Sequence, residues 1–148
     1  MDNREISEKY AKIAHELIGE EEELSDLYMS TASIVYLSSQ HKKVADGKKV
    51  FALCEKVPDR YKWGIPADFT ITVFEPNIEG FTDDQLRVLI YHELLHVGIK
   101  FNNDGTETYS IKPHDLEDFK LIINKFGTDW SVVDICDKSE ANWSVADV

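Results

Sequence analysis

The chain has 148 residues, 43% of them hydrophobic and 30% charged, which suits one folded domain with a single core. Its net charge of −12 argues against a nucleic acid or an anionic membrane as the main partner, since both need concentrated Lys and Arg. No apolar run approaches membrane-spanning length, and the charged, amphipathic N-terminus is unlike a signal peptide. The two cysteines, Cys54 and Cys136, form neither a disulfide framework nor a thiolate zinc site, which favours a reducing, cytoplasmic location.

Residues 1–30, approximately, are predicted to be helical. A first helix is indicated by apolar residues at helical spacing, and Gly19 is expected to end it. His15 lies off this apolar stripe and is expected at the surface. The acidic run Glu20–Glu23 is interpreted as the solvated start of a second helix. The apolar residues of the first helix are Ile6, Tyr10, Ile13, Ala14 and Leu17.

The pattern then changes to that of β-strands. In the clearest strand, Phe69–Glu75, apolar Phe69, Ile71 and Val73 alternate with their neighbours. Lysine pairs flank a turn at Asp46-Gly47 and are expected to be solvated loop residues. The other predicted strands are Ser33–Leu37, Lys49–Glu55 and, after a turn at residues 102–105, Glu107–Ile111.

A helix with a well-marked start follows the clearest strand. Thr82 and Gln85 form a capping box, in which each side chain pairs with a free backbone N–H of the other residue. Asp83 and Asp84 place negative charge at the positive end of the helix dipole. The residues that follow are apolar around most of the helix, which predicts a buried helix.

This buried helix carries the most informative motif, His92-Glu93-Leu94-Leu95-His96. Residues four apart lie on one helix face with Cβ atoms about 5–6 Å apart, so His92 and His96 can bind one metal ion together. Glu93 lies close enough to hold a metal-bound water, as in zinc metallopeptidases. The alternative is a pair of core histidines with Glu93 in solvent. Two His and a Glu on an apolar helix favour the metal, because it satisfies polar groups that are costly to bury.

The last predicted helix opens at Pro113, where a missing N–H does no harm, and ends at Gly127. Its buried stripe is expected to include Leu116 and Phe119. The extended metzincin motif would place Gly and His at the positions that hold Ile99 and Asn102, so that class is excluded. An acidic tail from about residue 137 to 148 is expected to pack weakly, within a single domain spanning residues 1–148.

A catalytic zinc usually has three protein ligands and one position for water. His114 is the favoured third ligand, because a helix N-terminus favours the neutral imidazole that binds metal. Asp115 could orient a ligand histidine by accepting a hydrogen bond. Glu117 and Asp115 are the alternative third ligands, since a downstream Glu completes the thermolysin-like site.

These motifs together resemble the family of phage metallopeptidases, which are small zincin-like proteins. The resemblance rests on Leu89–His96, Pro113–Phe119 and Phe126–Trp130, and it spans roughly Ala32 to Trp130. It implies His92, His96 and His114 as metal ligands and Glu93 as the catalytic residue. The chain is also somewhat similar to SprT-type domains, which share a short zincin core with three histidines.

The expected fold is α+β: a minimal zincin-like domain with N-terminal helices, a small mostly antiparallel sheet, the active-site helix and a closing C-terminal helix. The expected function is hydrolysis of a peptide bond with one zinc ion (Zn²⁺) per chain, a metal-activated water and Glu93 as general base. Phe69–Glu75 is expected to form the upper edge of the cleft and to pair with an extended peptide, and Tyr109 could stabilise the oxyanion.

Two other functions fit the same residues. The first is a catalytically silent zincin-like module that binds metal or a protein partner, because fold and metal do not guarantee activity. The second is a hydrolase for a non-peptide amide, such as a cell-wall crosslink. A structural zinc would need four protein ligands, and only three good candidates occur, which favours the peptidase acting on a peptide or protein substrate.

Overall fold

A four-stranded sheet forms the centre of the fold. The computed structural model describes residues 4–61, 64 and 66–113, and all structural statements concern these residues. The strand order is β1-β2-β6-β5; β2 and β6 run parallel, and the other two pairs are antiparallel. The strands are β1 (Arg4–Ile6), β2 (Ile34–Ser39), β6 (Phe69–Phe74) and β5 (Ala52–Lys56).

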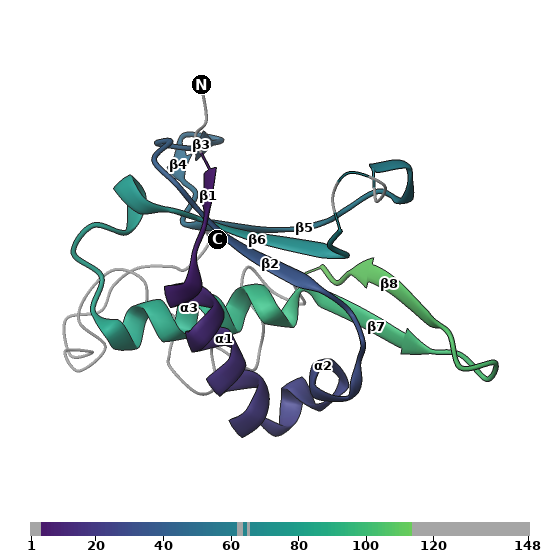
Figure 1. The fold of residues 1–148 in the computed structure, drawn as a ribbon. Helices are drawn as coiled ribbons and strands as arrows, with labels where there is room; N and C mark the ends of the chain where they lie inside the picture. Colours follow the sequence, from purple (N-terminus) through teal and green to yellow (C-terminus); the bar gives the residue numbers. More distant parts are fainter. Residues whose placement is uncertain (1–3, 62–63, 65, 114–148) are drawn as a thin grey trace.

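Helices α1 (Glu8–Glu20) and α3 (Asp83–Leu95) lie together on one side of this sheet, and the short α2 (Ser25–Met29) follows α1 (Figure 1). The core lies between them and the sheet: Ile71 and Val73 of β6 are completely buried, as are Leu89 and Leu94 of α3. Three short 3-10 helices complete the helical elements of the described residues: η1 (Glu22–Leu24), η2 (Asp59–Tyr61) and η3 (Glu75–Ile78). The described residues therefore form an α+β fold with mostly antiparallel pairing, as predicted.

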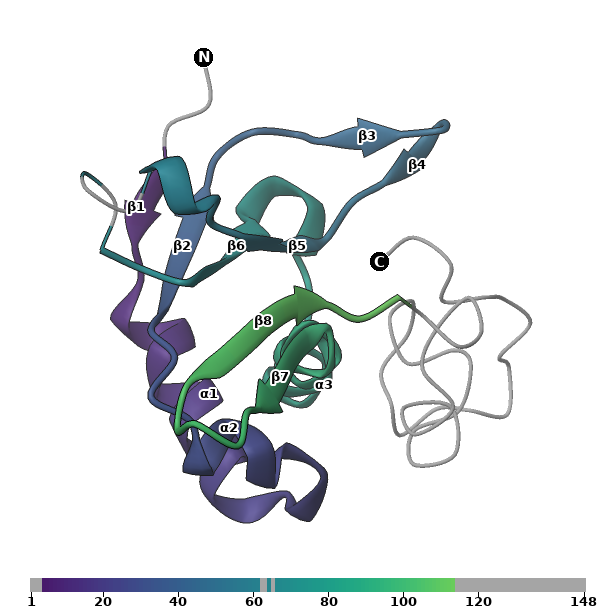
Figure 2. The same cartoon turned by 90° about the vertical axis from the view of Figure 1, so that its right-hand side faces the viewer.

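Two hairpins extend this framework. The first joins β3 (Val44–Ala45) to β4 (Lys48–Lys49) through a turn in which Asp46 and Gly47 both have positive φ, 53° and 76°. The second joins β7 (Val97–Phe101) to β8 (Glu107–Ile111). Figure 2 shows the β3–β4 hairpin projecting away from the helices and the β7–β8 hairpin lying beside α3.

Several expected boundaries are wrong, and each has a local reason. Ile6 was expected in the first helix but lies in β1 and is 76% exposed. The helix starts after it because Ser7 caps α1 and accepts a hydrogen bond from the backbone N–H of Tyr10. Gly19 does not end α1, which continues to Glu20. Lys48–Lys49 belongs to the first hairpin and is separate from β5. Strand β7 was not expected from its sequence; it is stabilised by pairing with β8.

The β6 strand is central in its sheet, so the prediction that it forms the edge of a cleft is wrong. β2 pairs with one side of β6 along its whole length, and β5 pairs with the other side. No backbone donors remain for an added peptide strand in such a position. Strand β5 is an edge strand of this sheet. One of its edges pairs with β6, and the other has no strand partner in the described part of the chain.

Helix α3 begins as predicted. The Thr82 hydroxyl accepts from the N–H of Gln85 at 3.1 Å, and the Gln85 side chain accepts from the N–H of Thr82 at 2.8 Å. From Leu86 to Leu95 every side chain except Arg87 is buried. Arg87 pairs with Glu16 and Glu20 of α1 at 3.4 and 2.5 Å, which fixes α3 against α1. Among the helices of the described residues, none combines the length and apolar character required to cross a membrane.

Candidate metal centre

The last turn of α3 carries the predicted metal ligands. His92 is completely buried and Glu93 is 2% exposed, so both polar side chains lie in the protein interior. His96 caps the C-terminus of the helix and remains in a right-handed helical conformation, with φ −73° and ψ −20°. The centroids of the His92 and His96 imidazole rings are 5.1 Å apart. Potential ligand atoms of these three residues lie within 4.8 Å of one another, so the structure brings together the motif as predicted.

His96 is oriented by the end of the β7–β8 hairpin. Its Nδ1 lies 2.7 Å from the carbonyl oxygen of Lys112, and the N–H of Lys112 donates to the carbonyl of His96, also at 2.7 Å. Because a carbonyl oxygen can only accept, Nδ1 carries a proton, and in the neutral imidazole Nε2 then has the lone pair. This is the tautomer needed for binding a metal through Nε2, and such contacts commonly orient metal ligands.

Sequence reasoning missed Lys112 as the residue that orients His96. It named Asp115 as a residue that could orient a ligand histidine, and Asp115 lies outside the described residues. A backbone carbonyl has no signature in the sequence, since every residue has one. The signal that could have indicated Lys112 is the pairing of the two extended segments across the turn at residues 102–105, which brings Lys112 beside His96.

Glu93 lies beside His92 on helix α3, which packs against strand β5. Its Oε2 is 3.9 Å from Nε2 of His92. Burial raises the pKa of the Cys54 thiol on β5, and the nearby charge of Glu93 raises it further. Cys54 is therefore a neutral thiol. The alternative reading, with Glu93 in solvent, is wrong because this side chain is buried.

The donor set fits a zinc ion. Imidazole nitrogens and a carboxylate are the ligand types zinc takes, and two histidines one helical turn apart can share one ion. The described residues supply His92 and His96, with Glu93 beside them. The three candidates for the third ligand, His114, Asp115 and Glu117, lie outside the described residues.

Tyr109 lies on β8 and is engaged with neighbouring residues. Its hydroxyl donates to Oε1 of Glu107 at 3.2 Å, and its ring packs against Phe69 with 5.5 Å between centroids. Burial raises its pKa. Its role as an oxyanion donor stays a prediction. His15 is exposed, as expected, with its ring edge to Tyr36.

The fold and the site define a class: an α+β domain whose central helix ends in an H-E-x-x-H motif, in agreement with a minimal zincin-like domain. The chain belongs to the family described as "Putative phage metallopeptidase", whose model matches residues 2–139. None of the curated proteins and none of the solved structures compared with this chain is significantly similar to it. The similarity to SprT-type domains stays a prediction.

Proposed function

We propose that this protein is a zinc-dependent peptidase that hydrolyses a peptide bond with Glu93 as general base. The observation that carries the proposal is the convergence of His92, Glu93 and His96, whose ligand atoms lie within 4.8 Å of one another at the end of a buried helix. The orientation of His96 by Lys112 supports it, because in the neutral imidazole Nε2 is then the nitrogen with the lone pair that a metal requires. The family name points to the same class of activity.

His114 completes the proposed ligand set. The support comes from chain connectivity. Lys112 forms two hydrogen bonds with His96, and His114 follows Lys112 by only two residues. Two residues of chain span at most about 7 Å, whereas the five residues to Glu117 span up to about 18 Å. Chain connectivity therefore keeps position 114 near the site, whereas it allows position 117 to lie much farther away.

The residues of this chain have separate tasks in the proposed reaction. A bound zinc ion supplies Lewis acidity and makes a water molecule acidic near neutral pH. Glu93 accepts the proton of the attacking water and delivers it to the leaving amine. Its burial removes competing solvent, which strengthens its interactions with groups that develop charge. The carbonyl oxygen of Lys112 accepts from Nδ1 of His96 and so favours one tautomer of this imidazole.

Strand β5 is the proposed site for the substrate backbone. It is the outer strand of the sheet on this side, and helix α3, which carries Glu93, packs against it. A peptide added to the free edge of β5 would gain backbone hydrogen bonds while its scissile bond lies near Glu93. This replaces the central strand β6 that the sequence suggested.

The test combines metal content with peptidase activity. The chain, purified without chelator and supplied with zinc, is compared with the variants His92→Ala, His114→Ala and Glu93→Gln. His41→Ala is the matched control, since His41 contacts Phe74 and is not part of the metal cluster. We expect about one zinc per chain in wild type, Glu93→Gln and His41→Ala, and loss of zinc in the other two. Cleavage of a peptide library by Glu93→Gln should fall by about 10²–10⁴-fold.

Each alternative gives a different result. Zinc binding without cleavage in wild type would support the catalytically silent module. Retention of zinc by His114→Ala would assign the third ligand to Glu117 or Asp115. Unchanged cleavage by Glu93→Gln would contradict the assigned general base.

A further inference from the structure

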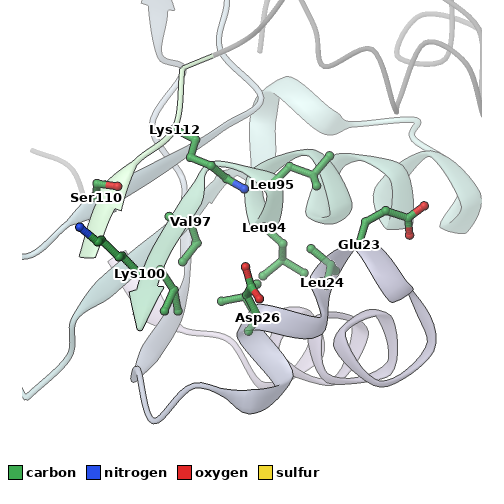
Figure 3. A pocket seen from close by; sticks show the side chains of 12 residues that line it. Glu23, Leu24, Asp26, Leu94, Leu95, Val97, Lys100, Ser110 and Lys112 are labelled. Carbon is green, nitrogen blue, oxygen red and sulfur yellow. The ribbon is translucent and has the colours of Figure 1, made fainter. Parts of the chain in front are cut away.

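A cavity of about 320 Å³ lies beside the last turn of α3, on the side of α2 and the β7–β8 hairpin (Figure 3). It has room for roughly ten water molecules at about 30 Å³ each, which suits a ligand the size of an amino acid or a dipeptide. Its apolar lining comes from the four elements η1, α2, α3 and β7 and includes Leu24, Leu27, Leu94, Leu95 and Val97. None of these residues has a role in the proposed peptidase reaction.

Opposite charges lie at two sides of this cavity. Figure 3 shows the ammonium group of Lys112 and the carboxylate of Asp26 pointing into it from opposite sides, with Leu94 between them. Neither side chain forms an ion pair within the part of the chain that the structure describes. Glu23, which also lines the cavity, accepts a hydrogen bond from the hydroxyl of Tyr91 at 3.1 Å. Lys100 also lines the cavity, but Figure 3 shows its ammonium group directed away from Lys112 and Asp26. Lys112 and Asp26 are thus the charged groups that point at a ligand in the cavity.

We propose that this cavity binds a zwitterion with an aliphatic side chain, of the α-amino acid or short-peptide type. The ammonium group of the ligand would pair with Asp26, its carboxylate with Lys112, and its side chain would pack against the leucines. A ligand with only one charge leaves one of the two protein charges unpaired, which disfavours simple anions and cations. Charge-assisted hydrogen bonds of this kind supply both affinity and orientation.

The cavity and the metal centre share Lys112. Its side chain points into the cavity, while its backbone holds His96. The cavity is nevertheless separate from the ligand atoms of the metal cluster, since neither His92 nor Glu93 lines it. Binding in the cavity can therefore be measured without metal, independently of whether the chain cleaves peptides.

The experiment is isothermal titration calorimetry of the full chain, in chelator, with a set of matched ligands. L-leucine is compared with N-acetyl-leucine, which lacks the ammonium group, with leucinamide, which lacks the carboxylate, and with glycine, which lacks the side chain. We expect leucine to bind and each incomplete ligand to bind at least about tenfold more weakly. The dipeptide leucyl-leucine distinguishes a short peptide from a free amino acid as the ligand. Tighter binding of the dipeptide than of leucine would assign the cavity to a short peptide, and weaker binding would assign it to a free amino acid.

Variants assign the two charges. Lys112→Met should remove the preference for leucine over leucinamide, and Asp26→Asn the preference for leucine over N-acetyl-leucine. Lys49→Met is the control for a lost positive charge, because Lys49 is exposed on the distant β4. Equal binding of all the wild-type ligands, no heat with leucine at tens of millimolar, or unchanged preferences in the two cavity variants would each overturn the proposal. The comparison of ligands on the wild-type chain tests the proposal even if a variant fails to fold.

Discussion

Gly98 allows the close approach that fixes His96. Gly98 pairs with Ser110 across the β7–β8 hairpin. A Cβ atom at position 98 would lie 2.5 Å from Oγ of Ser110, 3.0 Å from its carbonyl oxygen and 3.2 Å from Cγ of Lys112. A side chain at residue 98 would thus press on Ser110 and on the side chain of Lys112, the residue whose backbone orients His96. At the residue scale, the geometry of the metal ligand depends on a neighbour without a side chain.

Gly98→Ala is therefore expected to lower the free energy of unfolding by about 1–3 kcal/mol, as overpacking does, and to weaken zinc binding. Gly19→Ala is the matched control, since a Cβ at Gly19 meets nothing within 4 Å. It should be neutral or stabilise α1 by up to about 1 kcal/mol. Urea denaturation of both variants measures the difference. Adding Ser110→Ala to Gly98→Ala removes the 2.5 Å contact and should restore part of the stability, and absence of any coupling would contradict the steric explanation.

At the element scale, Glu107 ties the β7–β8 hairpin to the segment after α2. Its carboxylate accepts hydrogen bonds from the Ser30 hydroxyl and, at 3.0 and 3.2 Å, from the hydroxyl and the N–H of Thr31. The Ser30 hydrogen bond is the main cause that lowers the pKa of Glu107, with the contacts from Thr31 and Tyr109 adding to it. The hairpin that holds His96 is thus attached at its β8 strand by an ionised carboxylate.

This attachment has a predictable pH dependence. Because the pKa of Glu107 is lowered in the folded state, its contribution to stability is present above the ordinary value of about 4.3 and is lost as the pH falls through the lower folded value. The thermal unfolding midpoint of wild type should therefore exceed that of Glu107→Gln at pH 7, and the difference should shrink towards pH 3. Glu5→Gln, at an exposed position of β1, is the control. A difference that is independent of pH would contradict the role of the ionised Glu107.

At the scale of the whole molecule, the metal centre lies where three parts of the fold meet. Helix α3 contributes His92 and Glu93, strand β5 packs against α3, and the residue after the β7–β8 hairpin holds His96. These parts are far apart in the sequence and are joined by the packing of α3 against the sheet. Because an unfolded chain would not bring them together, metal binding and folding should be coupled.

Zinc is accordingly expected to stabilise the folded protein. At a free concentration about 100 times the dissociation constant, the gain is about 2.7 kcal/mol, or roughly 5–10 °C in the unfolding midpoint for a chain of this size. The rise should occur in wild type and in Glu93→Gln, and chelator should reverse it. Differential scanning calorimetry measures it. An equal rise in His92→Ala would show that zinc acts elsewhere.

The sequence alone determined the elements whose signals are local. The capping box of Thr82 and Gln85, the buried character of α3 and the strand at β6 all depend on residues a few positions apart, and the structure confirms them. The alternation in β6 does not separate a buried from an exposed face, because Thr72 and Phe74 are as fully buried as Ile71 and Val73. The pairing of His92 with His96 is equally local, because helical geometry brings residues four apart together. The candidate metal site could therefore be predicted before any tertiary structure.

The tertiary structure alone decided what depends on strand pairing. The sequence suggested β6 as a free edge, whereas pairing with β2 and β5 makes it central. The contact between Lys112 and His96, and the cavity between Lys112 and Asp26, likewise join residues that are distant along the chain. The physical reason is that backbone donors and acceptors are the same in every residue, so their long-range partners are chosen by the packing of whole elements and leave no local pattern.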